Sequence, residues 1–114
     1  MSAVDGLKYN EKGLIPVIAQ DYESGIVLMQ AYAKKEQILK TLEKGTAYYF
    51  SRSRNTEWHK GDTSGNYQYV EKVLVDCDMD CVLYMVRQEG AACHTGNFSC
   101  FYRRLNRNGE LKDE

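Results

Sequence analysis

Residues 67–88 have the sequence YQYVEKVLVDCDMDCVLYMVRQ, which is rich in the valine, tyrosine and leucine that favour β-strands. As one strand, this segment would extend about 70 Å at roughly 3.3 Å per residue. That length is about twice the diameter expected for a domain of this size, whose radius of gyration should be about 13 Å. The segment must therefore bend, and its weakest β-formers are Asp76, Asp78 and Asp80. The pattern predicts an antiparallel hairpin with an acidic tip.

The segments on its N-terminal side predict another hairpin and a helix. Residues 14–20 and 26–32 are apolar and flank the turn-forming sequence DYESG, which indicates two paired strands. Residues 34–44 predict a helix that ends at Gly45, a typical C-terminal stop signal. The apolar stripe of this helix consists of Ile38, Leu39 and Leu42.

The remaining segments complete an α+β domain. Residues 47–50 resemble a strand, whereas residues 51–66 are polar and contain glycine, so they predict a long loop. A compact loop at 93–100 and a short element at 101–105 precede a charged tail that we expect to fray. The 114 residues suit a single domain, residues 1–114, built mainly of antiparallel β-sheet with one or two helices.

Composition excludes several classes of function. A formal net charge of -1 gives no general attraction to nucleic acid or to anionic membranes, so we expect neither as a partner. Residues 1–10 lack the features of a signal peptide, and no apolar run approaches the roughly 20 residues of a membrane span. The expected compartment is the cytoplasm, where thiols stay reduced and the four cysteines are not disulfides.

The acidic tip is a candidate site for a hard cation. Asp76, Asp78 and Asp80 repel one another unless positive charge lies between them, and magnesium with oxygen ligands would supply it. An EF-hand is excluded, because its sixth and twelfth positions would be Cys81 and Arg87 instead of glycine and glutamate. A solvated acidic turn is the alternative, and spacing alone does not decide between them.

The cysteines predict a zinc site with an open position. Cys77, Cys93 and Cys100 supply three thiolates, which leaves water as a fourth ligand, as in catalytic zinc sites. No C-x-x-C pair is present, which argues against both a closed structural site and a thiol redox protein. On an extended chain, Cys81 would lie about 13 Å from Cys77, so we expect it to be a small core residue. Buried free cysteines are the alternative for all of them.

Two histidines bear on catalysis. His94 follows Cys93 directly, so an imidazole beside the proposed zinc-bound water is suited to general acid–base work. A hydrogen-bonded loop histidine explains the same spacing equally well. His59 lies in the sequence WHKG, where we expect contact with a substrate instead.

Residues 51–66 also indicate anion binding. Arg52 and Arg54 alternate, so they face one way on an extended chain, and a lysine and a Gly/Ser loop follow them. Guanidinium, ammonium and backbone N–H groups are the partners that phosphates need, and an aromatic ring can stack on a base. The predicted substrate contacts are Arg52, Arg54, Trp58, His59, Lys60, Ser64 and Asn66. A merely solvated charged face is the alternative.

Three long motifs occur in the order found in a known enzyme family. They are WHKGDTSGN at residues 58–66, DCDMD at 76–80 and ACHTGNFSCF at 92–101. Together with LMQAY at 28–32 and SRSR at 51–54, they resemble phosphoribosyl-AMP cyclohydrolase, an enzyme of histidine biosynthesis. The resemblance extends from about Leu14 to Tyr102.

The resemblance implies an intertwined homodimer of mixed α and β structure. It implies zinc held by Cys77 of one subunit and by Cys93 and Cys100 of the other. It also implies magnesium at the three aspartates of the tip. Some members carry a second, pyrophosphohydrolase domain, and this chain looks like the stand-alone form. Cys81 is not part of the family motif.

The implied reaction is hydrolysis of a nucleotide ring. The substrate is AMP whose N1 carries a second ribose 5-phosphate, so the ring is cationic and C6 is electrophilic. Zinc-bound hydroxide attacks C6, the N1–C6 bond opens, and His94 is the expected proton-transfer group. The product is the phosphoribosylformimino-aminoimidazole carboxamide ribonucleotide. The competing hypothesis is a zinc-stabilised nucleotide-binding module without catalysis, which would not need the acidic triad.

Overall fold

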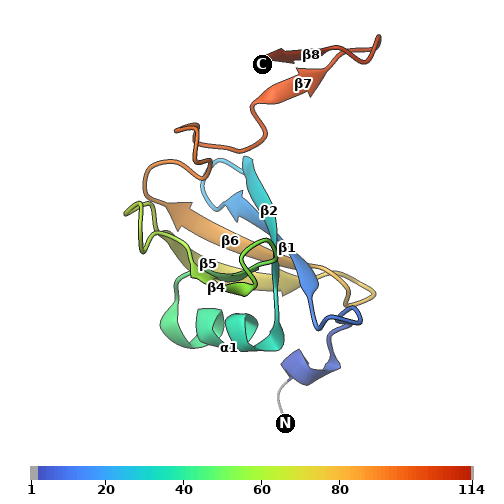
Figure 1. Cartoon of the computed structure of the whole chain (residues 1–114). Helices are drawn as coiled ribbons and strands as arrows, with labels where there is room; N and C mark the ends of the chain where they lie inside the picture. The colour runs from blue at the N-terminus through green and yellow to red at the C-terminus, as the bar shows by residue number, and fades with distance from the viewer. Residues whose placement is uncertain (1–2, 114) are drawn as a thin grey trace.

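A six-stranded sheet forms the centre of the computed structural model, which describes residues 3–113 (Figure 1). In spatial order its strands are β4 (Thr56–His59), β3 (Tyr48–Ser51), β2 (Val27–Ala33), β1 (Ile15–Asp21), β6 (Val82–Gln88) and β5 (Gln68–Val75). The helices are a 3-10 turn, η1 (Ala3–Gly6), and α1 (Lys35–Lys44). A separate two-stranded sheet consists of β7 (Arg103–Leu105) and β8 (Leu111–Asp113). The predicted α+β class is confirmed.

Both predicted hairpins are present and lie side by side in the sheet. β1 and β2 pair antiparallel around the turn at 22–26, and β5 and β6 pair antiparallel around the acidic tip. The two hairpins meet through β1 and β6, which run parallel, with Val17 opposite Val82. The sheet is therefore mixed, with one parallel pair among antiparallel ones.

The core lies on one face of the sheet, where every second side chain of the central strands is buried. In β1, Ile15, Val17 and Ala19 are fully buried, while the residues between them are only partly buried. β6 repeats this pattern with Val82, Tyr84 and Val86. A period of two is what a strand with one face on a core requires. The alternation fixes the register of the parallel pair, because a slip of one residue would expose both sets.

The helix forms where expected, but its buried face differs from the predicted stripe. Ile38 is buried, whereas Leu39 and Leu42 are 38% and 54% exposed. Gln37 and Thr41 are buried in their place. Both are hydrogen-bonded: the Gln37 amide donates to Glu57, and the Thr41 hydroxyl lies 3.2 Å from that of Tyr84. Burial of these polar groups is tolerated because each has a partner.

Two segments depart from the sequence-based expectation. The predicted loop at 51–66 contains β4, whose four residues pair with β3. β7 lies within the short element predicted at 101–105, but the tail after it, expected to fray, forms β8 and pairs with β7. This β7–β8 hairpin projects away from the main sheet with all its strand residues exposed (Figure 1). Strands this short show little periodicity in their sequence. They are recognised by the neighbouring strand with which each one pairs. Within residues 3–113, no helix is long and apolar enough to cross a bilayer.

Candidate functional site

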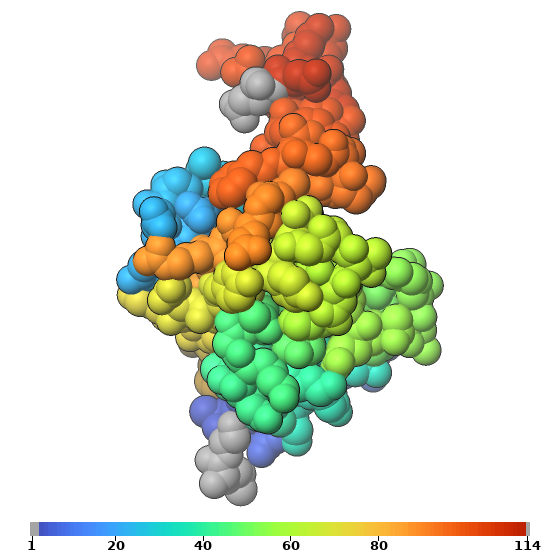
Figure 2. All heavy atoms as spheres, turned by 90° about the vertical axis from the view of Figure 1, so that its left-hand side faces the viewer, coloured from blue at the N-terminus to red at the C-terminus, as the bar shows by residue number. Residues whose placement is uncertain are grey.

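A cavity of about 820 Å³ opens between the 58–66 segment and the 91–101 loop. Figure 2 faces the side of the molecule where the yellow-green 60s segment meets the orange 90s segment. The residues around it include two from each of two predicted motifs: Trp58 and Lys60 from 58–66, and Cys93 and Cys100 from 92–101. His94 lines the same cavity and is exposed to solvent. The fold therefore brings two of the three resembling motifs together.

Hydrogen bonds to two strands hold the 91–101 loop in place. The Cys100 amide donates to the carbonyl of Leu28 at 2.7 Å, and the Ser99 hydroxyl donates to that of Val27 at 2.7 Å. From β6, the Gln88 amide donates to the Phe98 carbonyl at 2.9 Å. The loop lacks regular structure, so these contacts replace the ladder hydrogen bonds that position a strand.

The two thiols of the loop have pKa values shifted in opposite directions. Hydrogen bonds from Thr95, whose hydroxyl lies 3.0 Å from the Cys93 sulfur, lower the pKa of Cys93. Desolvation raises the pKa of Cys100 to about 11, and the neighbouring Cys93 adds to this rise. The thiols are close enough to interact, and their pairing makes one thiolate easy to form and the second difficult without added positive charge.

The acidic tip forms a compact turn with its carboxylates together. Ligand oxygens of Asp76, Asp78 and Asp80 lie within 4.8 Å of one another, and they are the one group of three or more such donors within residues 3–113. Hydrogen bonding to Asp78 and Asp76 raises the pKa of Asp80 to about 6. Desolvation raises the pKa of Asp76, but hydrogen bonds, first of all from the Asp80 amide, lower it overall. The crowded negative charge is what a cation would relieve.

Cys77 does not lie with the other two predicted zinc ligands in this chain. It is exposed on the acidic tip at the start of β6, whereas Cys93 follows the end of β6 (Figure 1). A strand of seven residues separates these ends by about 20 Å. Cys81 was predicted to be a small core residue, but it is half-buried and is not part of the core cluster. Desolvation raises the pKa of its thiol.

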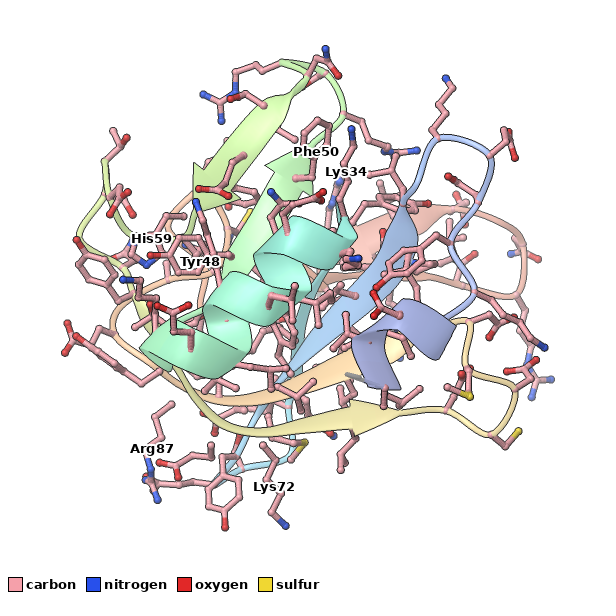
Figure 3. The ribbon with its side chains drawn as sticks, turned by 90° about the horizontal axis from the view of Figure 1, so that it is seen from below. Lys34, Tyr48, Phe50, His59, Lys72 and Arg87 are labelled. Carbon is pink, nitrogen blue, oxygen red and sulfur yellow. The ribbon has the colours of Figure 1, made fainter. Side chains whose placement is uncertain are left out.

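His59 has protein partners on both ring nitrogens. Its Nδ1 lies 2.8 Å from the Asp62 carboxylate, and its Nε2 lies 2.9 Å from the Thr46 hydroxyl. Its ring stacks on Tyr48 with the centroids 4.0 Å apart and the planes 3° from parallel (Figure 3). The ring thus ties the 60s loop to the sheet, and neither nitrogen is free for a substrate in this arrangement.

Lys60 is a buried cation beside the thiol loop. It is only 4% exposed, and its ammonium donates to the carbonyls of Asn66 and Ala91, both at 3.3 Å. Desolvation lowers its pKa. Lys60 therefore connects the 60s loop to the 91–101 loop across the cavity wall, a role that its sequence context did not reveal.

Arg52 and Arg54 lie by a second cavity of about 520 Å³, which shares Gln30, Arg54 and Trp58 with the first. Trp58 packs against Tyr49 with ring centroids 5.3 Å apart, so it forms a fixed wall between the two spaces. Ser64 and Asn66 line the first cavity. Each predicted substrate contact therefore borders one or both cavities.

The sequence profile of phosphoribosyl-AMP cyclohydrolase matches residues 29–102 of this chain. The chain belongs to the phosphoribosyl-AMP cyclohydrolase family. Phosphoribosyl-AMP cyclohydrolase of Pelotomaculum thermopropionicum is 55% identical over 95% of this chain and 84% of that protein. The enzyme of the same name from Archaeoglobus fulgidus is 60% identical over 87% of this chain and 92% of its own length. The histidine biosynthesis bifunctional protein of Caldanaerobacter subterraneus is 54% identical, and this chain covers 54% of its length.

These similarities confirm the family predicted from the motifs, and with it an enzyme, a hydrolase of histidine biosynthesis. The sequence did not point to several residues of this chain whose contacts organise the site. They are Thr46, Asp62, Gln88 and Ala91. The spacing of His59 and Asp62, three residues apart, was the one available signal for their contact. Thr46, Gln88 and Ala91 make contacts with residues further away in the sequence or through backbone groups, and sequence spacing does not indicate such contacts.

Proposed function

We propose that this chain hydrolyses N1-(5-phosphoribosyl)-AMP by addition of water at C6 and cleavage of the N1–C6 bond. The observation that carries this proposal is the 820 Å³ cavity in which Cys93, Cys100 and His94 face the 58–66 motif. Such a volume suits a nucleotide, because small-molecule sites typically measure about 300–1,000 Å³. The family membership supplies the substrate class, and the cavity supplies a place for it.

The donor set fits zinc at the thiol pair. Cys93 and Cys100 offer two soft sulfur ligands that lie close enough to interact, and hydrogen bonds from Thr95 lower the pKa of Cys93, which favours its thiolate form. Zinc held there supplies Lewis acidity that lowers the pKa of water to about 7. The site needs further ligands, because two thiolates leave the tetrahedral set incomplete.

We infer that Cys77 of a second copy completes this set in a homodimer. Support comes from the placement of Cys77, which is exposed and at the opposite end of β6 from Cys93. One chain cannot span that separation without unfolding the β5–β6 hairpin. A second copy whose acidic tip reaches the cavity would bring Cys77 and the three carboxylates to it together.

The donor set of the acidic tip fits magnesium. Carboxylate oxygens are hard ligands, and three within 4.8 Å of one another suit a hard cation. Magnesium bound there neutralises charge and can contact substrate phosphate. We propose one zinc and one magnesium per chain, with the zinc ligands shared across the dimer.

His94 is the proposed proton carrier. Attack at C6 releases a proton from the water, and the departing N1 must gain one as the ring opens. An imidazole at the cavity wall can accept the first and donate the second, because its ordinary pKa lies near neutrality. Trp58 is the proposed stacking surface for the adenine ring, with Ser64 and Asn66 as polar contacts. Lys60 and His59 act by holding the walls of the cavity.

The test is to assay ring opening by the change in ultraviolet absorbance and to measure bound zinc in the same samples. We expect serine in place of Cys77, Cys93 or Cys100 to remove both zinc and activity. Cys81→Ser is the matched control and should retain both, since Cys81 is a half-buried thiol outside the family motif. Active protein without zinc, or equal losses for all four variants, would contradict the assignment. Zinc and nucleotide binding without turnover would favour a non-catalytic binding module.

A further inference from the structure

The second cavity carries unbalanced positive charge. It is bordered by Arg52 and Arg54, and by no carboxylate among its lining residues. Within residues 3–113, neither guanidinium forms an ion pair, whereas Arg87 on another face is paired with Glu71 and Glu23. Arginines left unpaired beside a cavity are available to an anion, and their planar forks match phosphate oxygens.

The position of Arg52 is fixed by an aromatic ring. Its guanidinium carbon lies 3.9 Å from the centroid of the Tyr32 ring, which is a close cation–π contact. The N–H groups of a stacked guanidinium point outward from its edge and stay free to donate. The turn beside it is also ordered, because the Arg54 amide donates to the Ser51 hydroxyl at 3.3 Å. Ser51 and Ser53 add hydroxyl donors at the cavity wall.

The two cavities have different chemistry on either side of Trp58. Cys93, Cys100 and the Gly/Ser loop at 61–65 border only the larger cavity, while Arg52 borders only the smaller. Trp58, Gln30 and Arg54 border both, so one elongated ligand can occupy the two spaces at once. The substrate is elongated in this way, with a phosphate on each of two riboses.

The substrate's own geometry decides which phosphate lies where. The reacting bond joins C6 to N1, so the ribose on N1 must stay near the thiols and the 61–65 loop. The ribose on N9 leaves the opposite edge of the purine, away from the reacting carbon. With the ring along Trp58, the N9 side is the one that extends towards Arg52.

Resting on the proposed function, we propose that Arg52, Arg54 and the Ser51 and Ser53 hydroxyls form the subsite for the 5′-phosphate of the AMP half. Tyr32 is a positioning residue that holds Arg52 by stacking. The phosphate on the N1 ribose is left to the larger cavity. The two phosphates of the substrate are thus assigned to different cavities.

AMP and adenosine are the probes, because they differ only in this phosphate. Binding of each to the zinc-loaded full-length protein is measured by calorimetry. Arg52→Gln should weaken AMP by at least about tenfold, the loss expected for a charge-assisted hydrogen bond, while adenosine binding is unchanged. Arg54→Gln should act in the same direction. Arg107→Gln, an exposed arginine in the β7–β8 turn, is the matched control and should change neither.

Tyr32→Leu separates positioning from charge, because it keeps both guanidiniums but removes the ring under Arg52. We expect a smaller loss of AMP affinity than in Arg52→Gln, with adenosine again unaffected. Unchanged AMP affinity in both arginine variants, or equal losses for AMP and adenosine, would overturn the subsite. If Arg52→Gln does not fold, Arg54→Gln decides the matter, since its side chain is exposed and unpaired within the described residues. Ring opening by the wild type, assayed separately, tests the proposed function independently of this result.

Discussion

At the scale of single residues, neighbouring groups assign different states to chemically identical side chains. Cys93 and Cys100 lie in one loop, yet hydrogen bonds from Thr95 lower the pKa of the first and desolvation raises that of the second. Cys81 is shifted upward, by desolvation first and then by the nearby carboxylates. Among these three thiols, the local surroundings therefore favour the thiolate only at Cys93.

His94 and His59 should respond differently to removal of the imidazole. His94→Ala should lower turnover by about 100- to 10,000-fold, the usual contribution of a general acid–base group, with zinc content unchanged. His59→Ala removes the contacts to Asp62 and Thr46, so it should loosen the 60s loop and mainly raise KM. The measurements are steady-state kinetics and zinc analysis of both variants. Zinc lost with His94→Ala would make His94 a ligand instead, and unchanged turnover would move the proton transfer elsewhere.

A buried hydrogen bond in the core offers a stability test. The Tyr49 hydroxyl donates to the Gln68 side-chain oxygen at 2.5 Å, and both side chains are fully buried. Tyr49→Phe leaves that oxygen without a partner, which should lower the free energy of unfolding by about 1–3 kcal/mol. Urea denaturation measures the change. Tyr22→Phe, on the surface, is the control and should have little effect. Equal changes in the free energy of unfolding for the two variants would mean that the buried hydrogen bond of Tyr49 does not stabilise the fold.

At the scale of elements, the β5–β6 tip stores electrostatic repulsion in the metal-free protein. Hydrogen bonding to Asp78 and Asp76 raises the pKa of Asp80 from 3.8 to about 6, so the folded state holds this proton more tightly than the unfolded state. Stability from this group therefore increases as the pH falls from 6 to 3.8, and is absent at neutral pH. The lowered pKa of Asp76 acts in the opposite sense, but only at more acidic pH.

Asp78→Asn should reduce this pH dependence. Without the Asp78 carboxylate, the pKa of Asp80 should fall towards its ordinary value, with Asp76 alone left to raise it. The metal-free variant should therefore melt at a higher temperature than the wild type at pH 7. The same change should abolish the rise in Tm that we expect magnesium to give the wild type. Thermal melts between pH 4 and 7, with and without magnesium, measure both effects, and Asp113→Asn is the control. A variant that melts lower at pH 7 and still responds to magnesium would contradict this account.

The helices and strands also differ in how well the sequence predicted them. The β5–β6 hairpin follows from its length and its aspartates, and α1 from its flanking Gly45, whose φ of 78° glycine adopts readily. The predicted buried stripe of α1 was right for Ile38 and wrong for Leu39 and Leu42. Gln37 and Thr41 are buried instead, because they find hydrogen-bond partners on β4 and β6 that no helical pattern reveals. β4 was missed because its four residues, with Trp58 as the one large apolar side chain, are too few to show a clear period, and only pairing with β3 makes them a strand.

At the scale of the whole molecule, a shared zinc site predicts complementation between inactive chains. Cys77→Ser and Cys93→Ser should each be inactive, yet a heterodimer of the two contains one complete ligand set. Mixing and reassembling the chains should therefore restore part of the activity, limited to one site per dimer. Co-purification of two differently tagged chains verifies the heterodimer. Verified heterodimers without activity would show that each zinc site lies within one chain.

The sequence by itself determined the family, the two central hairpins and the residues that we propose to hold metal. These depend on residue identity and short spacing, which a chain displays directly: thiols and carboxylates in order, and alternation where a strand has one buried face. Only the tertiary structure decided which of these residues meet. Cys93 reaches Cys100 and the 58–66 motif because the loop is bonded to β2, while Cys77 is carried to the far end of β6. Proximity between distant segments depends on the order and pairing of the strands, and these cannot be read from local sequence patterns.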